Sequence, residues 1–327
     1  MRDDAHQPAA LARLHQRLYR LVERLVDRLL VQAAEAFVSM RYGCFAAICL
    51  GAADVDYWRN SGAIHAPTDF IIEGKHRMGV TLIGIDCATQ DVNTGVALAD
   101  YDDGVIVLRE VMVGSHDRPA VSIVSSWLRS SDGPMLLALD APLGWPAPLA
   151  PALIGHRAGS RIDTPMDALF QRKTDHFVQK TQGKKPLDVG ADRIARTAHA
   201  ALRILGELGD RLGMPIPLLW ALPFDGVGAI EVYPAATLIA HRCRSEGYKK
   251  AEQANAREEI LSTLRTLMDL ACDDSLLKAD ADALDAAVCV LAAADFLQGR
   301  AVPPADRSLA EREGWIWVPP SQCGSRS

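Results

Sequence analysis

The sequence predicts an α/β fold in which a mixed β-sheet is flanked by helices and preceded by an N-terminal helical extension. Three strand-like runs, at residues 79–87, 95–99 and 105–113, are separated only by short turns, which is typical of a meander. Helical and strand-like segments then alternate along the rest of the chain, an order that favours a sheet with helices on its faces.

The extension is predicted from residues 8–40, where leucines recur every three or four positions with arginines between them, as in an amphipathic helix. The two series are Leu11, Leu14, Leu18, Leu21, Leu25 and Leu29, and Arg13, Arg17, Arg20, Arg24 and Arg28. Such a helix docks on a domain, pairs with its own copy in a homodimer, or lies on a membrane surface. We assign 1–77 to this extension and 78–327 to the folded domain. Because Met78 directly precedes the first strand, a start of translation there is also open, and 1–77 would then not belong to the native protein.

The remaining elements follow from short apolar runs and from helical periodicity. The run MLLALD at 135–140 ends in an acid and suits a central strand that is covered on both faces. Two further strands are expected at 228–233 and 315–318, and a proline-rich loop at 142–151. Helices are expected at 119–129, 191–212, 251–270 and 279–298, and one more opens at Pro234. The helix at 279–298 is apolar almost all round, so we expect it to be buried.

Composition narrows the function classes. The 327 residues include 35 Lys and Arg against 41 Asp and Glu, which gives a net charge of −6. This charge argues against a protein that coats nucleic acid through bulk positive charge, so any anionic partner must meet a local basic patch or metal ions. The seven cysteines form no CxxC pair, and we expect reduced thiols. No apolar run is long enough to span a bilayer, so we expect a soluble, cytoplasmic protein.

Acidic residues close two of the predicted strands and lie on the last helix. Asp86 ends the first strand and Asp140 the fourth, and Asp282 and Asp285 lie in the buried helix. Ligands of open α/β sheets bind beyond the carboxyl ends of the strands, and two carboxylates on adjacent strands repel unless a cation neutralises them. The acids therefore predict a Mg²⁺ or Mn²⁺ site. Taken singly, each has a structural alternative as a turn former, a loop residue or the start of a helix.

Six segments in order resemble a known family over residues 79–300. They are GIDCATQDVNTGVAL, LALDAPLGWP, FQRKTDHFVQK, KPLDVGADRIARTA, EVYPAATL and DALDAAVCVLAAADF. The chain is similar to the predicted nucleases with a ribonuclease H-like fold that are catalogued as domain of unknown function 429.

This resemblance implies a five-stranded mixed sheet like that of Holliday-junction resolvases and integrases. It also implies that the acids matching Asp86, Asp140 and Asp285 ligate two divalent metals, with Asp282 and Asp285 resembling the acidic motif of the resolvases' final helix. Resolvases commonly carry Glu on the fourth strand, where this chain has Asp140, which is one methylene shorter.

Further candidates surround these acids. For Glu231, in the segment EVYP, three interpretations are open: a metal ligand, a general base, or a residue that anchors a turn by hydrogen bonds. The stretch 157–203 holds ten Lys and Arg against five Asp. Its Arg172, Lys173, Asp175 and Arg193 are candidate substrate-binding residues, and the basic ones suit phosphate. Arg172 and Asp175 also have the i,i+3 spacing of an intrahelical pair, and a solvated surface remains the alternative for the whole stretch.

The sequence thus predicts a metal-dependent hydrolase, a nuclease that cleaves phosphodiester bonds of DNA or RNA, with Asp86, Asp140, Glu231 and Asp285 catalytic. Two alternatives stay open. The segment from Gly84 to Gly95 also resembles the first phosphate loop of actin-like ATPases and sugar kinases, although residues 78–327 are too few for their duplicated core. The third reading is a non-catalytic nucleic-acid-binding protein.

Overall fold

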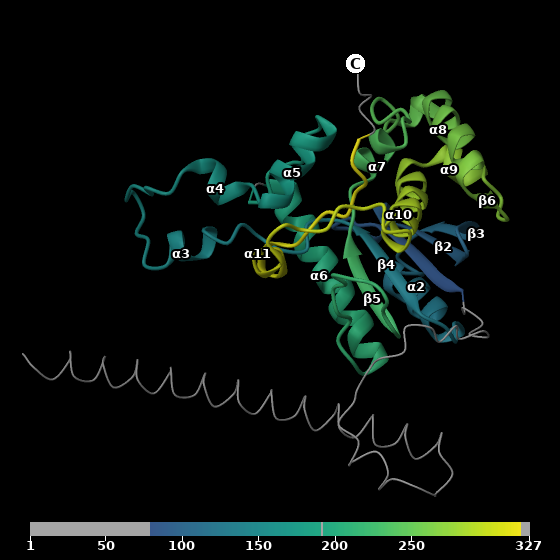
Figure 1. Cartoon of the computed structure of the whole chain (residues 1–327), viewed down its shortest axis with the longest axis horizontal. Helices are drawn as coiled ribbons and strands as arrows, with labels where there is room; N and C mark the ends of the chain where they lie inside the picture. The colour runs from purple at the N-terminus through teal and green to yellow at the C-terminus, as the bar shows by residue number, and fades with distance from the viewer. Residues whose placement is uncertain (1–78, 191, 322–327) are drawn as a thin grey trace, which may run out of the picture. The chain divides into compact units, whose positions relative to one another are not determined.

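The computed structural model of the chain describes residues 79–190 and 192–321 (Figure 1). The predicted helix at 8–40, and the extension 1–77 as a whole, lie outside the described residues. No helix in the described ranges is long and apolar enough to cross a membrane.

The centre of the fold is a six-stranded mixed sheet with the order β5-β4-β1-β2-β3-β6. Its strands are β1 (Val80–Asp86), β2 (Gly95–Asp102), β3 (Val105–Val113), β4 (Met135–Asp140), β5 (Val227–Glu231) and β6 (Asp269–Leu270). β1, β4 and β5 run parallel, whereas β2 is antiparallel to both β1 and β3. The five long strands form the ribonuclease H-like sheet that the resemblance implied. The two-residue β6, which pairs with β3, was not predicted.

Helices cover both faces of this sheet (Figure 1). α2 (Ala120–Ser130) and α6 (Asp192–Leu212) share one core with Ile83 and Ile85, while α8 (Ala254–Leu267) and α10 (Ala281–Leu297) share the other core with Leu82. Successive side chains of β1 therefore alternate between two apolar layers, as the two-residue period of a strand requires. The expected helix at 251–270 ends at Leu267, because the chain then extends to form β6.

α10 packs closest to the sheet. A Cβ on Gly84 of β1 would lie 2.0 Å from the carbonyl oxygen of Ala286, and one on Gly95 of β2 would lie 2.0 Å from that of Asp282. These glycines let the helix backbone touch the strands. The side chain of Asp280 begins the helix by accepting hydrogen bonds from the amides of Asp282 and Ala283.

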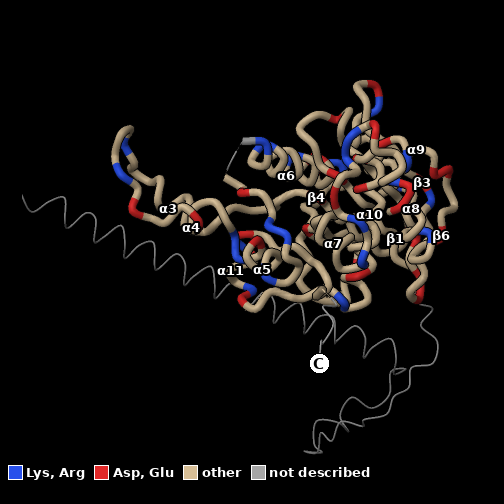
Figure 2. The backbone as a smooth tube through the Cα atoms, turned by 90° about the horizontal axis from the view of Figure 1, so that it is seen from above, with Lys and Arg blue, Asp and Glu red and all other residues tan. Residues whose placement is uncertain are grey.

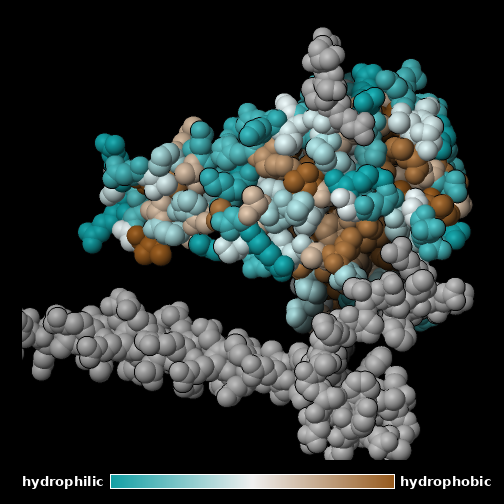
Figure 3. All heavy atoms as spheres, in the orientation of Figure 1, coloured by the Kyte–Doolittle hydropathy of each residue, from teal (hydrophilic) through white to brown (hydrophobic). Residues whose placement is uncertain are grey.

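The connection between β4 and α6 projects away from the sheet in its first part (Figures 1 and 2), whereas its last helix packs against the rest of the domain. It contains α3 (Leu149–Leu153), α4 (Met166–Phe170) and α5 (Lys173–Gln182), so the expected proline-rich loop at 142–151 includes a short helix. Arg157 and Arg161, between α3 and α4, are exposed, as are the apolar Ile154 and Met166. Figure 3 shows hydrophobic surface on this projection between hydrophilic residues.

The C-terminal part returns to the edge of the sheet. α7 (Pro234–Ala240) begins at the expected proline, α9 (Ser275–Ala279) precedes α10, and α11 (Arg307–Glu313) follows it. The terminal strand expected at 315–318 is wrong as a full strand, because only Ile316 forms a bridge, parallel to Glu231. This single bridge still brings the C-terminal segment against the end of β5.

Candidate metal centre

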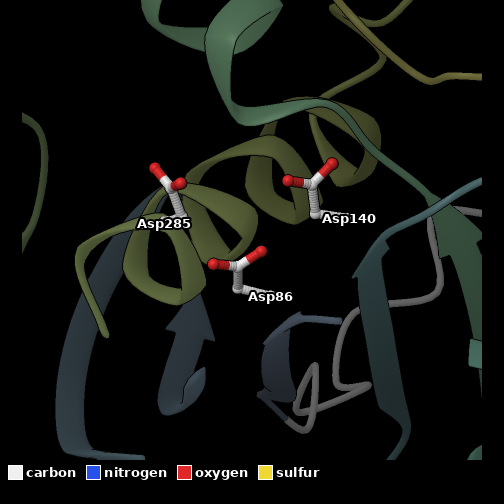
Figure 4. Close-up of side chains that lie close together, drawn as sticks. All are labelled: Asp86, Asp140 and Asp285. Carbon is white, nitrogen blue, oxygen red and sulfur yellow. The ribbon is translucent and has the colours of Figure 1, made fainter. Parts of the chain in front are cut away.

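Three carboxylates meet at the carboxyl edge of the sheet. Asp86 ends β1, Asp140 ends β4 and Asp285 lies on α10, and one oxygen of each lies within 4.8 Å of the others (Figure 4). The structure thus brings together three of the four predicted metal ligands. No other group of His, Cys, Asp or Glu among the described residues gathers in this way.

The register of the sheet and the packing of α10 produce this cluster. Asp86 and Asp140 are direct partners in the parallel pairing of β1 with β4, so neighbouring-strand spacing holds their backbones about 4.8 Å apart. Asp285 reaches them because Ala286, the next residue of α10, lies against Gly84 of β1. Three segments distant in sequence therefore place their acids around one point.

Asp282 lies one helical turn before Asp285 but outside the cluster. Its side chain is partly exposed. Burial raises the pKa of Asp282, Asp280 raises it further, and Lys249 acts in the opposite direction. The structure therefore shows Asp282 as a neighbour within electrostatic range, and its role as a ligand stays a prediction.

The cluster is poorly suited to holding its negative charge alone. Burial raises the pKa of Asp86 well above its usual range, and the charges of Asp140, Asp282 and Asp280 raise it further. Burial also raises the pKa of Asp140 to about 6, with Glu231 contributing, while Lys249 lowers it. Desolvated carboxylates that repel one another in this way are stabilised by a cation.

Two residues that the sequence analysis did not single out complete the cluster. The hydroxyl of Tyr248 donates a hydrogen bond of 2.8 Å to Oδ1 of Asp285, and Nζ of Lys249 forms an ion pair with Oδ2 of the same carboxylate. Both lie in the segment between α7 and α8, which has no helical or strand periodicity. An aromatic residue followed by two lysines is its only signal.

The donor set fits a hard divalent cation. Mg²⁺ binds oxygen ligands at about 2.1 Å, so two ligands of one ion lie at most about 4.2 Å apart. A spread of up to 4.8 Å is close to this limit, so Asp86, Asp140 and Asp285 are the residues that would hold such an ion. All three candidate donors are carboxylates, which suit a hard divalent cation better than a thiophilic metal.

Glu231 belongs to a second buried network beside the cluster. Its two carboxylate oxygens accept hydrogen bonds from Arg172 of 2.7 and 2.9 Å, and Oε2 also accepts one from the amide of Leu143. The guanidinium bonds in addition to both carboxylate oxygens of Asp175 and to the carbonyl of Glu313. The carboxylate of Glu231 therefore anchors Arg172 and the segment after β4. Its roles as a metal ligand and as a general base stay predictions.

Of the predicted substrate-binding residues, two are buried and two are exposed. All five N–H donors of Arg172 are engaged, so a phosphate would have to displace a carboxylate from it. Asp175 is equally buried and bonds to the amide of Arg172. The structure thus confirms the i,i+3 pair. Lys173 and Arg193 are exposed, and their contact with substrate stays a prediction.

Two neighbouring cavities open at the cluster. One, of about 290 Å³, is lined by both strand-end acids and by the Arg172 network, and its outer wall includes Leu187, Ile194 and Thr197. The other, of about 320 Å³, is lined by Lys184, Tyr248 and the segment 245–247. Asp140, Tyr233 and Lys249 line both. A separate open cavity of about 620 Å³ along the second half of α6 contains none of the candidate residues.

Comparison with solved structures gives a match with low sequence identity. The structure titled "T. thermophilus RuvC in complex with Holliday junction substrate" is 15% identical to this chain, with a TM-score of 0.28. The match covers 69% of this chain and 99% of that one. No curated protein is significantly similar in sequence.

The family comparison covers the three clustered acids. The model of a family described as "Protein of unknown function (DUF429)" matches residues 84–308, well over half of the chain. The matched range begins just before Asp86 and extends past Asp285, so it includes the three clustered acids, Arg172 and Lys249. The resemblance drawn from the six sequence segments is thereby confirmed, and the chain belongs to the DUF429 family.

Proposed function

We propose that this protein is a metal-dependent phosphodiesterase that hydrolyses nucleic acid at the Asp86–Asp140–Asp285 cluster. The observation that carries the proposal is the convergence of three carboxylates, with oxygens within 4.8 Å, from two adjacent strand ends and one buried helix. Buried acids of a purely structural kind are paired individually. Here Asp86 and Asp140 face each other, and burial works against their ionisation.

The chain's own residues prepare this site for a cation. Asp86, Asp140 and Asp285 would supply the ligand oxygens, and Tyr248 fixes the orientation of Asp285 through its hydrogen bond. The Arg172 network holds Glu231 and the backbone at Leu143, which lies three residues after Asp140. A divalent cation bound at such a site lowers the pKa of bound water and stabilises the charge on phosphate oxygens.

Basic side chains near the two cavities support nucleic acid as the substrate. Residues 78–327 carry seven more acidic than basic side chains, so a polyanion gains attraction only from local cations. Arg193 and Arg196 are exposed on α6 beside Ile194 and Thr197, which line the cavity. Lys249 lies at the junction of the two cavities. A phosphodiester at the cluster would therefore have cations within reach on both sides.

Cleavage assays test the proposal. Purified protein is incubated with Mg²⁺, with Mn²⁺ or with EDTA, and with end-labelled single-stranded, duplex and branched DNA and RNA. We expect metal-dependent cleavage by the wild type and a loss of at least about 100-fold in Asp86→Asn and Asp140→Asn, because each replacement removes a charged ligand. Asp132→Asn, an exposed position away from the site, is the matched control and should cleave as the wild type does.

The outcomes separate the competing functions. Wild-type turnover in both site variants, or equal cleavage in EDTA, would contradict the metal site as the reactive centre. Hydrolysis of labelled ATP without cleavage of any nucleic acid would favour the phosphotransferase alternative. Binding of nucleic acid without turnover under all metal conditions would favour the non-catalytic alternative.

A further inference from the structure

Lys249 brings a positive charge to the three clustered carboxylates. Its Nζ forms an ion pair with Oδ2 of Asp285, and its charge lowers the pKa of Asp86, Asp140 and Asp282 against the effect of burial. Arg172, the other cation that lines the first cavity, has every donor engaged by protein oxygens. Lys249 is thus the cation whose charge is directed at the three acids.

The side chain of Lys249 reaches the cluster from the surface of the protein. This side chain is 56% exposed, whereas that of Asp285 is fully buried. The ammonium also lies 5.4 Å from the centre of the Tyr248 ring, a weak cation–π contact. Because the lysine stem reaches the acid from the surface, it can withdraw into solvent without unpacking the core.

An ammonium and a divalent cation compete for the same carboxylate. Both are attracted to Asp285, and at a few ångströms they repel each other. Lys249 would therefore have to leave Oδ2 of Asp285 for a divalent ion to bind that carboxylate. Lys249 lines both cavities. Once released from Asp285, its ammonium would therefore stay where the two cavities meet, next to a phosphate bound at the cluster.

We infer that Lys249 is an exchangeable counterion: it neutralises the cluster while no divalent ion is bound, and on metal binding it moves from Asp285 to the phosphate of the substrate. This inference rests on the proposed function, since it requires the cluster to bind a divalent cation. It assigns Lys249 two partners in succession, a carboxylate and then a phosphodiester.

Calorimetric titration with Mn²⁺ alone tests the first half. Lys249→Met removes the competing charge, so Mn²⁺ should bind roughly threefold to tenfold more tightly than to the wild type. Lys250→Met, an exposed neighbour with the same change of charge, should bind Mn²⁺ as the wild type does. An unchanged or weakened affinity in Lys249→Met, or an equal gain in both variants, would overturn the inference.

A measurement on the unaltered protein covers the case in which Lys249→Met does not fold. Brief acetylation, followed by mass spectrometry, reports how freely each lysine reacts. Saturating Mn²⁺ should raise the acetylation of Lys249 severalfold and leave that of Lys250 unchanged, because the ion pair with Asp285 is released. Equal reactivity of Lys249 with and without Mn²⁺ would overturn the exchange.

The second half is tested by nucleic-acid binding. With Ca²⁺ in place of Mg²⁺ to slow turnover, Lys249→Met should bind a labelled single-stranded oligonucleotide more weakly and lose about one phosphate contact of salt dependence, whereas Lys250→Met should not. An unchanged salt slope would overturn the phosphate contact.

If the wild type shows no Mn²⁺ binding that Asp86→Asn removes, the proposed function fails together with this inference. If that binding is present and Lys249→Met leaves it unaltered, only the inference fails.

Discussion

Gly84 of β1 and Ala286 of α10 touch backbone to backbone. A Cβ on Gly84 would lie only 2.0 Å from the Ala286 carbonyl oxygen and 3.0 Å from the amide nitrogen of Val290. No side chain fits at that point, and the helix lies directly on the strand that ends at Asp86. Because Gly84 has no side chain, α10 can lie close enough to β1 to bring Asp285 to the two strand-end acids.

Gly84→Ala should displace α10 and weaken the metal site. We expect a loss of about 1–3 kcal/mol in the free energy of unfolding, the usual cost of overpacking a core, and weaker binding of Mn²⁺. Gly206→Ala is the control, because a Cβ there meets nothing within 4 Å and the residue lies inside α6. It should be neutral or stabilising. Urea unfolding and Mn²⁺ titration check both, and wild-type metal affinity in Gly84→Ala would contradict the spacing argument.

The stability of the metal-free protein should depend on the charge of the strand-end acids. The pKa of Asp140 rises to about 6 in the folded protein from its ordinary value of 3.8, and that of Asp86 rises well above 3.8, chiefly through burial. A carboxyl group whose pKa is raised in the folded protein favours folding most at low pH, where the group is protonated in both the folded and the unfolded protein. It loses that contribution as the pH rises through the folded pKa.

The comparison uses Asp86→Asn/Asp140→Asn, which cannot ionise at these positions. In EDTA, the double variant should gain stability relative to the wild type as the pH rises from about 4 to 6, and further above that as Asp86 ionises. Added Mn²⁺ should reduce the difference at pH 7.5, because it stabilises only the protein that binds it. Urea unfolding at several pH values measures this, and parallel profiles for the two proteins would contradict it.

Much of the fold and the strand-end acids could be predicted from local patterns. The runs at 105–113 and 135–140 coincide with β3 and β4, because a short, continuous apolar run between turns is typical of a buried strand. Asp86 and Asp140 were predictable as neighbours because parallel strands place their carboxyl ends at one edge. The two-residue β6 was not, since so short a strand depends on its partner β3 and has no periodicity of its own.

The partners of the acids depend on tertiary contacts that a sequence does not display. Arg172 was considered a phosphate contact because it lies in a basic stretch, yet Glu231, 59 residues away, takes two of its donors. Lys249 lies in an aperiodic segment and becomes important only because α10 brings Asp285 to it. Spacing along the chain revealed the Arg172–Asp175 pair but not these longer connections.

Arg172 should prove essential to stability rather than to phosphate binding alone. Arg172→Met leaves the buried carboxylates of Glu231 and Asp175 without their partner, and we expect a loss of about 3–5 kcal/mol in the free energy of unfolding. Lys173→Ala, next to it but exposed, should change stability by less than about 0.5 kcal/mol. Thermal or urea unfolding separates the two, and equal stability of Arg172→Met and the wild type would refute the structural role of the network.

The central claim is that Asp86, Asp140 and Asp285 together bind a divalent cation. The most direct measurement is anomalous X-ray scattering from crystals grown or soaked with Mn²⁺, for the wild type and for Asp140→Asn. We expect one or two manganese peaks within about 2.0–2.4 Å of oxygens of these three carboxylates in the wild type, and loss or strong weakening of the peaks in the variant. Fully occupied manganese elsewhere with none at the three acids, or equal peaks in both proteins, would contradict the claim.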